Sequence, residues 1–286
     1  MQEVTGSTPV FSTKTLLQSV EEGFLFRILR CLKFKLLKII DEIITQLTDM
    51  RDLRDKVAYI TGGSKGIGLG VARSLLDTGM KVAISGRNKS GLDAALKQLG
   101  SGQNVLAIES DVTKIDNEHK AVGQIIEKWG KLDVVLANAG LGLFAPVDEL
   151  SEHDWYQMIN TNLNGVFHTL KASVEALKKS KGYYITLASL AGTNFFPNGA
   201  GYNATKFGVV GFTQAAMLDL RKYDIKVSTI MPGSVATHFN NNEPNEKDAW
   251  KIQPEDIGEL VVDLLKMHPR TLPSKIEVRP SRPDKK

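Results

Sequence analysis

The chain has 286 residues, of which 42% are apolar and 24% charged, a composition that excludes disordered and fibrous proteins. Its formal net charge is +4, and residues 50–286 lack the concentrated basic stripe of a nucleic-acid-binding protein. With a single cysteine, Cys31, no intrachain disulfide can form. No Cys/His cluster has zinc-ligand spacing, so we expect no metal site and a reducing, cytoplasmic setting.

Residues 1–49 differ in character from the rest. Residues 24–47 repeat leucine and isoleucine at helical spacing and interleave them with lysine and arginine. This pattern predicts a basic amphipathic helix, but no apolar run approaches the ~18 residues of a spanning helix. Such a helix could lie on a membrane surface or a partner, or cover an apolar patch of its own chain.

A further interpretation of residues 1–49 also stays open. Met50 stands just before the first strand of the main domain, and residues 6–9 can be back-translated into a sequence resembling the T-arm of a transfer-RNA gene. Met50 would then be the natural start, and residues 1–49 would be upstream sequence read in frame. Membrane contact is expected only if the extension belongs to the native protein.

From residue 50 onward, short runs rich in Val, Ile and Leu alternate with helical patterns. We expect strands at 56–61, 81–85, 105–109, 133–137, 183–188, 226–231 and 275–279. Helices are expected at 66–78, 88–99, 114–129, 151–178, 201–222 and 254–267. This alternation predicts an α/β fold in which residues 50–286 form one domain. Its core would be a doubly wound parallel sheet of about seven strands with helices on both faces.

The first chemical signal is the glycine-rich turn after the first strand, Thr61-Gly62-Gly63-Ser64-Lys65-Gly66-Ile67-Gly68. Glycines allow a tight turn and close backbone approach, and the helix that follows aims its free N–H groups at a pyrophosphate. The turn therefore predicts a dinucleotide site. The same run also fits the G-x-S-x-G elbow of serine hydrolases, with Ser64 as nucleophile, although no earlier strand is available to supply the usual oxyanion donor.

The second strand ends in Ser85-Gly86-Arg87. An acidic residue here would bond the ribose 2′-hydroxyl of NAD, and none is present. Arg87 and Lys65 instead offer two positive charges where a 2′-phosphate would lie. We therefore expect NADP(H) to be favoured over NAD(H).

The second chemical signal is a Ser–Tyr–Lys set. Tyr202 and Lys206 are four residues apart in a predicted helix, so their side chains share one face. Ser189 follows the fifth strand and the run Asn138-Ala139-Gly140 follows the fourth. Both lie at carboxyl ends of parallel strands, where α/β sheets bind ligands.

With these motifs in this order, residues 50–286 resemble the short-chain dehydrogenase/reductase family, and 3-oxoacyl-[acyl-carrier-protein] reductases in particular. The resemblance implies a Rossmann fold, a nicotinamide cofactor, carbonyl/alcohol chemistry, and a homodimer or homotetramer. It implies Ser189, Tyr202, Lys206 and Asn162 as catalytic residues. The implied cofactor-binding residues are Thr61, Gly62, Ser64, Lys65, Gly66, Ile67, Gly68, Arg87, Asp111, Val112, Asn138, Ala139, Gly140, Tyr202, Lys206, Pro232, Gly233, Val235 and Thr237.

Carbonyl reduction needs a hydride from the cofactor and a proton from the protein. Tyr202 would be the general acid/base, and a cationic Lys206 within ~4–6 Å would lower the pKa of the phenol. As the family implies, Ser189 would hold the substrate oxygen, and Asn162 would support a water linked to Lys206. We assign no role to Thr205, Asp116 or the histidines.

The expected substrate is a small carbonyl compound or alcohol. Residues 141–144 and 192–197 predict a partly apolar pocket, and residues 238–253 a polar lid. We expect reduction of a ketone or aldehyde, with a 3-oxoacyl thioester among the candidates. Oxidation of a small hydroxy compound or sugar with NAD(P)+ and a cofactor-binding regulator without turnover remain alternatives.

Overall fold

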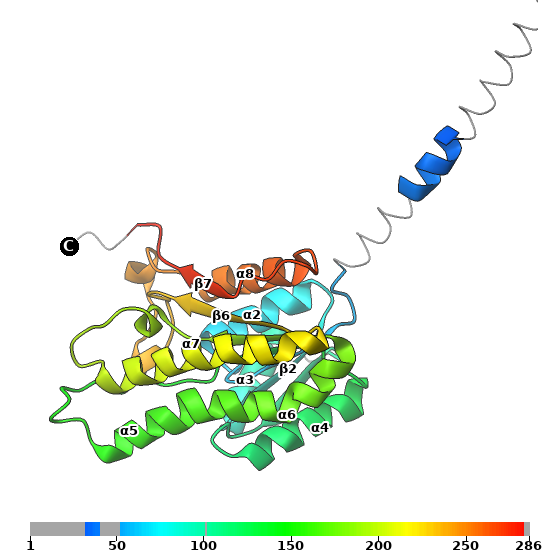
Figure 1. The fold of residues 1–286 in the computed structure, drawn as a ribbon. Helices are drawn as coiled ribbons and strands as arrows, with labels where there is room; N and C mark the ends of the chain where they lie inside the picture. Colours follow the sequence, from blue (N-terminus) through cyan, green and yellow to red (C-terminus); the bar gives the residue numbers. More distant parts are fainter. Residues whose placement is uncertain (1–31, 41–51, 101, 283–286) are drawn as a thin grey trace, which may run out of the picture. The chain divides into compact units, whose positions relative to one another are not determined.

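Seven parallel strands organise the main part of the chain. In the computed structural model, which describes residues 32–40, 52–100 and 102–282, these strands form one sheet in the order β3-β2-β1-β4-β5-β6-β7 (Figure 1). They are β1 (Val57–Ile60), β2 (Lys81–Gly86), β3 (Val105–Glu109), β4 (Val134–Ala137), β5 (Tyr183–Leu187), β6 (Lys226–Pro232) and β7 (Lys275–Val278). Every strand expected from the sequence is present within one or two residues of its predicted bounds.

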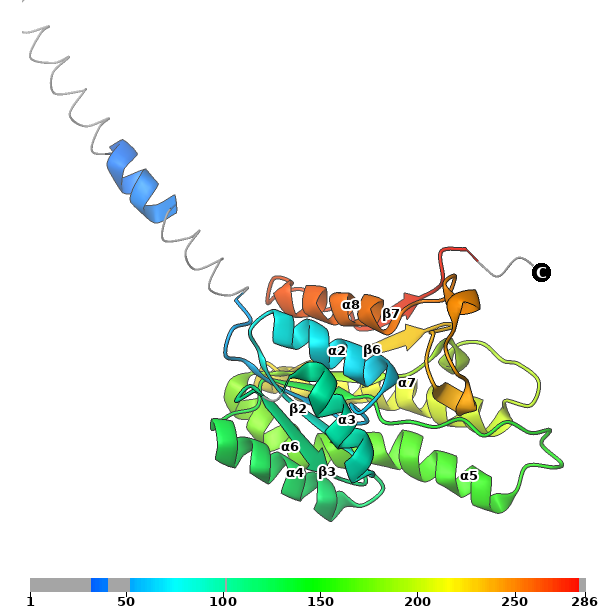
Figure 2. The same cartoon turned by 180° about the vertical axis from the view of Figure 1, so that it is seen from behind.

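Helices cover both faces of the sheet, as Figures 1 and 2 show from opposite sides. One face carries α2 (Gly66–Asp77), α3 (Lys89–Leu99) and α8 (Pro254–Lys266), whose buried side chains join one hydrophobic core. The other face carries α4 (Ile115–Trp129), α6 (Gly165–Ser180) and α7 (Ala200–Leu220), which join a second core. The doubly wound α/β fold is confirmed, and Leu53–Lys286 forms one compact unit.

The strand order places a crevice beside β1. From β1 the chain builds outward to β2 and β3, and it then returns to form β4 on the other side of β1. Because the crossovers to the two sides run over opposite faces, the loops leaving β1 and β4 diverge and leave room for a ligand. All four residues of β1 are fully buried, which explains why this strand reads as a continuous apolar run.

The predicted helix over 151–178 is interrupted. The structure has α5 (Glu152–Met158), a π-helical stretch (Ile159–Asn164) and then α6. The stretch has the sequence INTNLN and contains no glycine or proline that would have indicated an interruption of the helix. Such π-bulges are frequent at functional sites, and this one carries Asn162.

Residues 32–40 of the N-terminal extension are helical, and all their side chains are exposed. The remaining positions of the predicted amphipathic helix, and Met50, lie outside the described residues. Among the helices that the structure describes, none is both long and apolar enough to cross a membrane.

Candidate active site

The glycine turn after β1 has no room for side chains at its glycine positions. Gly62 and Gly66 adopt φ values of 64° and 57°, which favour glycine. A Cβ on Gly62 would lie 2.9 Å from the Cα of Ala139, and one on Gly68 would lie 2.6 Å from Nδ2 of Asn138. Lys65 precedes α2 without a side-chain cap, so the first N–H groups of α2 face the turn uncapped. This geometry fits an anionic group such as a pyrophosphate.

Asn138 ties the loop after β4 to this turn. Its Nδ2 atom donates to the carbonyl oxygens of Thr61 and Gly62, at 2.8 and 3.1 Å. In return, Oγ1 of Thr61 accepts from the backbone N–H groups of Asn138 and Ala139. Asn138, which we expect among the cofactor-binding residues, thus holds the loop after β4 against the glycine turn.

The ends of β2 and β3 form a polar hollow beside the turn. Its volume is about 380 Å³, and its lining includes Arg87, Asp111 and Lys114. A carboxylate oxygen of Asp111 accepts from the N–H and hydroxyl of Thr113, which fixes the loop that carries buried Val112. Arg87 and Lys65 are exposed, and Ser64 lies against Gly86 at the end of β2.

Tyr202 and Lys206 lie on the inward face of α7, as predicted, and both are buried. Nζ of Lys206 donates to the carbonyl oxygen of Leu187 at 2.9 Å and lies 5.6 Å from the centroid of the Tyr202 ring. The side chain of Ser189 lies near the hydroxyl of Tyr202 and lowers the pKa of that phenol. Ser189 also caps a short 3-10 turn, because its Oγ accepts from the N–H of Ala191 at 3.1 Å. The structure thus brings the three predicted side chains together.

The protonation of the pair departs from our expectation. Burial raises the pKa of Tyr202 to about 12, and the side chain of Ser189 lowers it only in part. Burial lowers the pKa of Lys206 to about 8. The expected lowering of the Tyr202 pKa by Lys206 is therefore wrong for this structure, because desolvation dominates both groups while the ammonium is directed at Leu187. At pH 7 both groups are mostly protonated.

Asn162 forms hydrogen bonds to two different segments beside this pair. Its Oδ1 accepts from the N–H of Leu141, and its Nδ2 donates to the carbonyl oxygen of Leu141 and to Oγ1 of Thr205. Thr205, to which we assigned no role, in turn donates to the carbonyl oxygen of Tyr202. A Cβ on Gly140 would lie 3.3 Å from Oδ1 of Asn162 and 3.6 Å from Nζ of Lys206. The π-helical stretch thereby connects α7 to the loop after β4.

The segment after β6 closes the site near the glycine turn. Gly233 donates to the carbonyl oxygen of Val278, and Val235 pairs with Ile252, so the segment is held at both sides. Pro232 is the last residue of β6. The side chain of buried Thr237 lies next to Gly66, where an added Cβ would be 3.4 Å from it. Oγ1 of Thr237 also accepts from the N–H of Phe239 at 3.3 Å.

The predicted lid is less polar than its composition suggests. Phe239 contacts the rings of Tyr202 and Phe144, with centroids 5.6 and 6.4 Å apart. The sequence predicts residues 238–253 as a polar lid and does not single out Phe239. A lone phenylalanine among asparagines was the available signal, since an apolar ring in a polar loop needs a surface to cover it.

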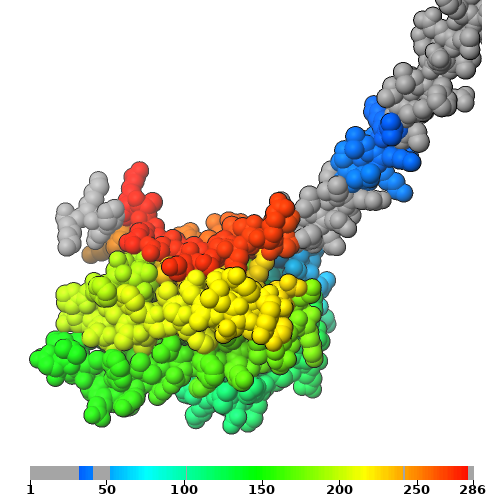
Figure 3. Space-filling view, in the orientation of Figure 1, coloured from blue at the N-terminus to red at the C-terminus, as the bar shows by residue number. Residues whose placement is uncertain are grey.

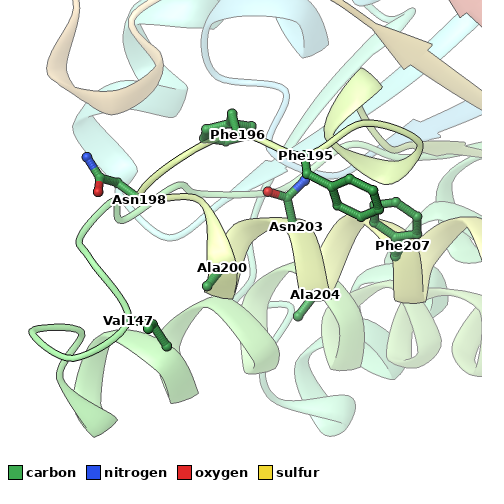
Figure 4. Close-up of a pocket in the computed structure, with 8 residues that line it drawn as sticks. All are labelled: Val147, Phe195, Phe196, Asn198, Ala200, Asn203, Ala204 and Phe207. Carbon is green, nitrogen blue, oxygen red and sulfur yellow. The ribbon is translucent and has the colours of Figure 1, made fainter.

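A separate apolar groove lies on the outward face of α7. Its volume is about 490 Å³, and Figure 4 shows Ala200, Ala204 and Phe207 of α7 along it. The ring of Phe195 stacks on Phe207 at a centroid distance of 5.2 Å. Phe195, expected near the site, therefore faces away from Tyr202, whereas Phe196 contacts Phe144.

The serine hydrolase alternative finds no support in the geometry. Positive φ falls on Gly62 and Gly66, so Ser64 lacks the strained conformation of a nucleophile elbow. No hydrogen bond to a histidine is seen for Ser64 within the described residues. In the same part of the chain, no group of three His, Cys, Asp or Glu side chains is placed to hold a metal ion.

Comparisons with known proteins identify the family of the chain. Residues 56–248 match the model of the short chain dehydrogenase family. An uncharacterized oxidoreductase of Staphylococcus aureus is 34% identical over 232 residues, covering 81% of this chain and 100% of the relative. An alcohol dehydrogenase from Thermococcus sibiricus, solved with 5-hydroxy-NADP, superposes with a TM-score of 0.75 and 32% identity over 81% of this chain and 100% of its own.

A second solved structure is similar at lower identity. The 3-ketoacyl-(acyl-carrier-protein) reductase from Brucella melitensis, solved with NADH, has a TM-score of 0.73 and 26% identity and covers 80% of this chain and 99% of its own. The chain belongs to the short-chain dehydrogenase/reductase family. It is an NAD(P)-dependent oxidoreductase of that type.

Proposed function

We propose that this protein reduces a ketone or aldehyde to an alcohol with NADPH, and that Tyr202 is the proton donor. The observation that carries the proposal is the contact of Tyr202 with Ser189 and Lys206 beside the glycine turn, at the carboxyl edge of the sheet. The turn and the uncapped N-terminus of α2 fit the pyrophosphate of a dinucleotide. When bound, the reduced nicotinamide supplies a hydride to the carbonyl carbon.

The residues of this chain handle the charge that develops on the substrate oxygen. Because the pKa of Tyr202 is about 12, the phenol keeps its proton until an alkoxide forms and takes it. The oxygen of Ser189 already accepts from Ala191, so its own proton can be directed at the substrate oxygen. Lys206, with a pKa of about 8, is an ammonium at pH 7, and it would stabilise the phenolate left by proton transfer once it turns from the carbonyl oxygen of Leu187 toward the phenol.

The same pKa values favour reduction over the opposite direction. Oxidation of a hydroxy compound or sugar needs Tyr202 as a base, and a pKa of about 12 leaves almost no phenolate at neutral pH. Oxidation therefore remains the second candidate. It would become dominant only if bound coenzyme turned the ammonium of Lys206 toward the phenol.

The preference for NADPH rests on charge. The strand β2 is followed by Arg87 and Asn88 rather than by an acidic residue, and exposed Lys65 lies in the adjoining turn. A ribose 2′-phosphate would meet two cations there, whereas a ribose hydroxyl would find no carboxylate. The Thermococcus sibiricus dehydrogenase solved with an NADP derivative and the Brucella melitensis reductase solved with NADH show that similar proteins bind either coenzyme.

A homodimer or homotetramer is part of the proposal. The helices α6 and α7 lie side by side on the face seen in Figure 3, and the rings of Phe167 and Phe212 contact across them. Phe167, Phe207 and Leu218 leave apolar surface exposed on these helices. Light scattering would test this, with a monomeric mass as the contrary result. The cytoplasmic setting stays a prediction from the single cysteine.

The experiment that tests the function is NADPH consumption by the purified full chain against a panel of ketones and aldehydes. Tyr202→Phe should lower turnover at least ~100-fold, the low end for loss of a general acid. Tyr156→Phe, a matched change at an exposed tyrosine of α5, should have no effect. Near-normal turnover by Tyr202→Phe would identify another proton donor, and no consumption with any carbonyl by the wild type would overturn the proposed reaction.

A further inference from the structure

Three phenylalanines from three different loops gather at Tyr202. Phe144 follows β4, Phe196 follows β5 and Phe239 follows β6. The ring of Phe144 is central, with centroids 5.4 Å from Tyr202, 5.7 Å from Phe196 and 6.4 Å from Phe239. The ring of Phe239 also reaches Tyr202 at 5.6 Å. We call Phe144, Phe196 and Phe239 the aromatic cluster.

The aromatic cluster has a fitted base. A Cβ on Gly142 would lie 2.6 Å from Cζ of Phe239 and 2.8 Å from Cζ of Phe144, so both rings seat directly over this glycine. The side chains that pack with Tyr202 below are apolar, namely Met158, Ala191, Leu141, Leu143 and Leu150. The rings therefore border an apolar cluster on this side rather than solvent.

Part of each ring remains exposed, and Phe196 also lines the groove on the outward face of α7. Phe144, Phe196 and Phe239 are 37%, 41% and 38% exposed, although each contacts another ring. Exposed aromatic surface beside a reactive hydroxyl marks a binding surface, because a ligand that covers it removes apolar area from water. The rings meet edge to face at 63–73°, an arrangement that a further flat ring can extend.

We propose that the substrate is a carbonyl compound with an aromatic or compact cyclic apolar group next to the carbonyl, and that Phe144 and Phe239 hold this group. The inference rests on the proposed function, since it takes Tyr202 as the proton donor. A carbonyl at the Tyr202 hydroxyl places its substituent against rings that lie 5.4 and 5.6 Å from that tyrosine. The cluster thereby sets specificity.

The same surface disfavours polar carbonyl compounds. Sugars and 2-oxo acids would bring hydroxyl or carboxylate groups against three phenylalanine rings, which offer them no hydrogen bonds. A polar group left without a partner discriminates more strongly than a missing apolar contact does. We therefore expect acetophenone to be reduced with a kcat/KM at least ~10-fold above that of dihydroxyacetone.

The test compares wild type, Phe239→Ala, Phe239→Leu and Tyr156→Ala on acetophenone and on acetaldehyde with NADPH. Because Phe239 is partly exposed, its loss should leave the fold intact, which thermal denaturation checks. Phe239→Ala should lower kcat/KM for acetophenone at least ~10-fold, mainly through KM, and change that for acetaldehyde less than ~3-fold. Phe239→Leu should recover part of the loss, and Tyr156→Ala, outside the cluster, should lose nothing.

The outcomes separate the two proposals. Preferred turnover of dihydroxyacetone or pyruvate, or equal losses on both carbonyls in Phe239→Ala, would overturn the substrate class and leave the reductase function standing. If the wild type turns over no carbonyl, calorimetric titration of acetophenone into protein with NADPH decides. Binding that Phe239→Ala abolishes would support the aromatic site and overturn the reaction alone, whereas no binding would overturn both.

Discussion

The phenol oxygen of Tyr59 lies 3.0 and 3.2 Å from the two carboxylate oxygens of Glu118, and both side chains are completely buried. The hydroxyls of Ser110 and Thr169 also donate to this carboxylate, at 2.7 and 2.9 Å. Burial, followed by the charge of Glu118, holds the pKa of Tyr59 well above its usual value. These contacts join β1 and the end of β3 to α4 and α6, beneath the adenosine side of the proposed coenzyme site.

Replacing Glu118 should therefore destabilise the fold. Glu118→Ala leaves the buried hydroxyl of Ser110 without its acceptor, whereas Tyr59 and Thr169 each keep a second one, so the free energy of unfolding should fall by about 2 kcal/mol. Glu118→Gln keeps one acceptor oxygen and should cost about 1 kcal/mol. Urea denaturation measures both, with Glu127→Ala, an exposed glutamate of the same helix, as the control. Wild-type stability in Glu118→Ala would contradict the network's role.

The activity should fall at alkaline pH because Lys206 loses its charge. Its pKa is about 8, so the ammonium that stabilises the Tyr202 phenolate disappears as the pH rises above that value. Tyr202, with a pKa of about 12, stays protonated over the same range and cannot cause the decline. We expect kcat/KM for carbonyl reduction to be flat near pH 7 and to decrease above about pH 8. A profile that stays flat to pH 10 would refute the role of the ammonium.

The stability should change in the opposite sense over that range. The folded chain, with Lys206 at a pKa of about 8 against an ordinary 10.5, binds fewer protons than the unfolded chain between these values. The contribution of this group to the free energy of unfolding therefore rises with pH, by up to about 3 kcal/mol. Lys206→Met removes the titrating group. The free energy of unfolding of the wild type, relative to that of the variant, should therefore increase between pH 8 and 10.5. A difference independent of pH would be inconsistent with this burial effect.

Coenzyme choice should respond to Arg87. Arg87→Asp replaces a cation at the end of β2 with a carboxylate, which repels a 2′-phosphate and can accept from a ribose hydroxyl. We expect kcat/KM with NADPH to fall at least ~10-fold while that with NADH rises. Arg270→Asp, the same charge change at an exposed arginine after α8, controls for net charge. Equal effects on both coenzymes would show that Arg87 does not read the phosphate.

Asn162 should matter more for turnover than for coenzyme binding. Asn162→Ala removes three hydrogen bonds that hold Leu141 and Thr205, so α7 and the loop after β4 lose their connection beside Lys206. We expect kcat to decrease by about 10-fold or more, while the Kd for NADPH changes little. Fluorescence titration of NADPH against steady-state kinetics separates the two effects. A loss confined to NADPH affinity would place the role of Asn162 on the coenzyme side.

Most strands could be predicted closely because the inner strands of the sheet are buried on both faces, unlike the edge strand β7. Runs such as β4 are apolar throughout, and the turn residues that bound them are distinctive. The placement of Tyr202 and Lys206 on one face could also be predicted, because residues four apart in a helix share a face. The pKa shifts of these two residues could not be predicted, since desolvation depends on how β5 and the surrounding loops pack against them.

Other features depend on contacts between distant segments. The residue types in the π-helical stretch do not distinguish it from an α-helix. Its position is explained only by the hydrogen bonds of Asn162 to Leu141 and Thr205. Glu118 reads as one more charged residue of an amphipathic helix, and its partners come from three other elements. Phe239 stands in a polar loop whose path over Tyr202 no local pattern specifies.

Thr237 packs against Gly66 in the phosphate-facing turn and holds the backbone of Phe239 through its hydroxyl. One threonine thus connects that turn to the loop that carries Phe239. Thermodynamic linkage is reciprocal. A compound that fixes the position of Phe239 must therefore increase the affinity for the coenzyme, and by the same factor by which the coenzyme increases the affinity for the compound. Affinities measured for either ligand alone would then understate those of the ternary complex.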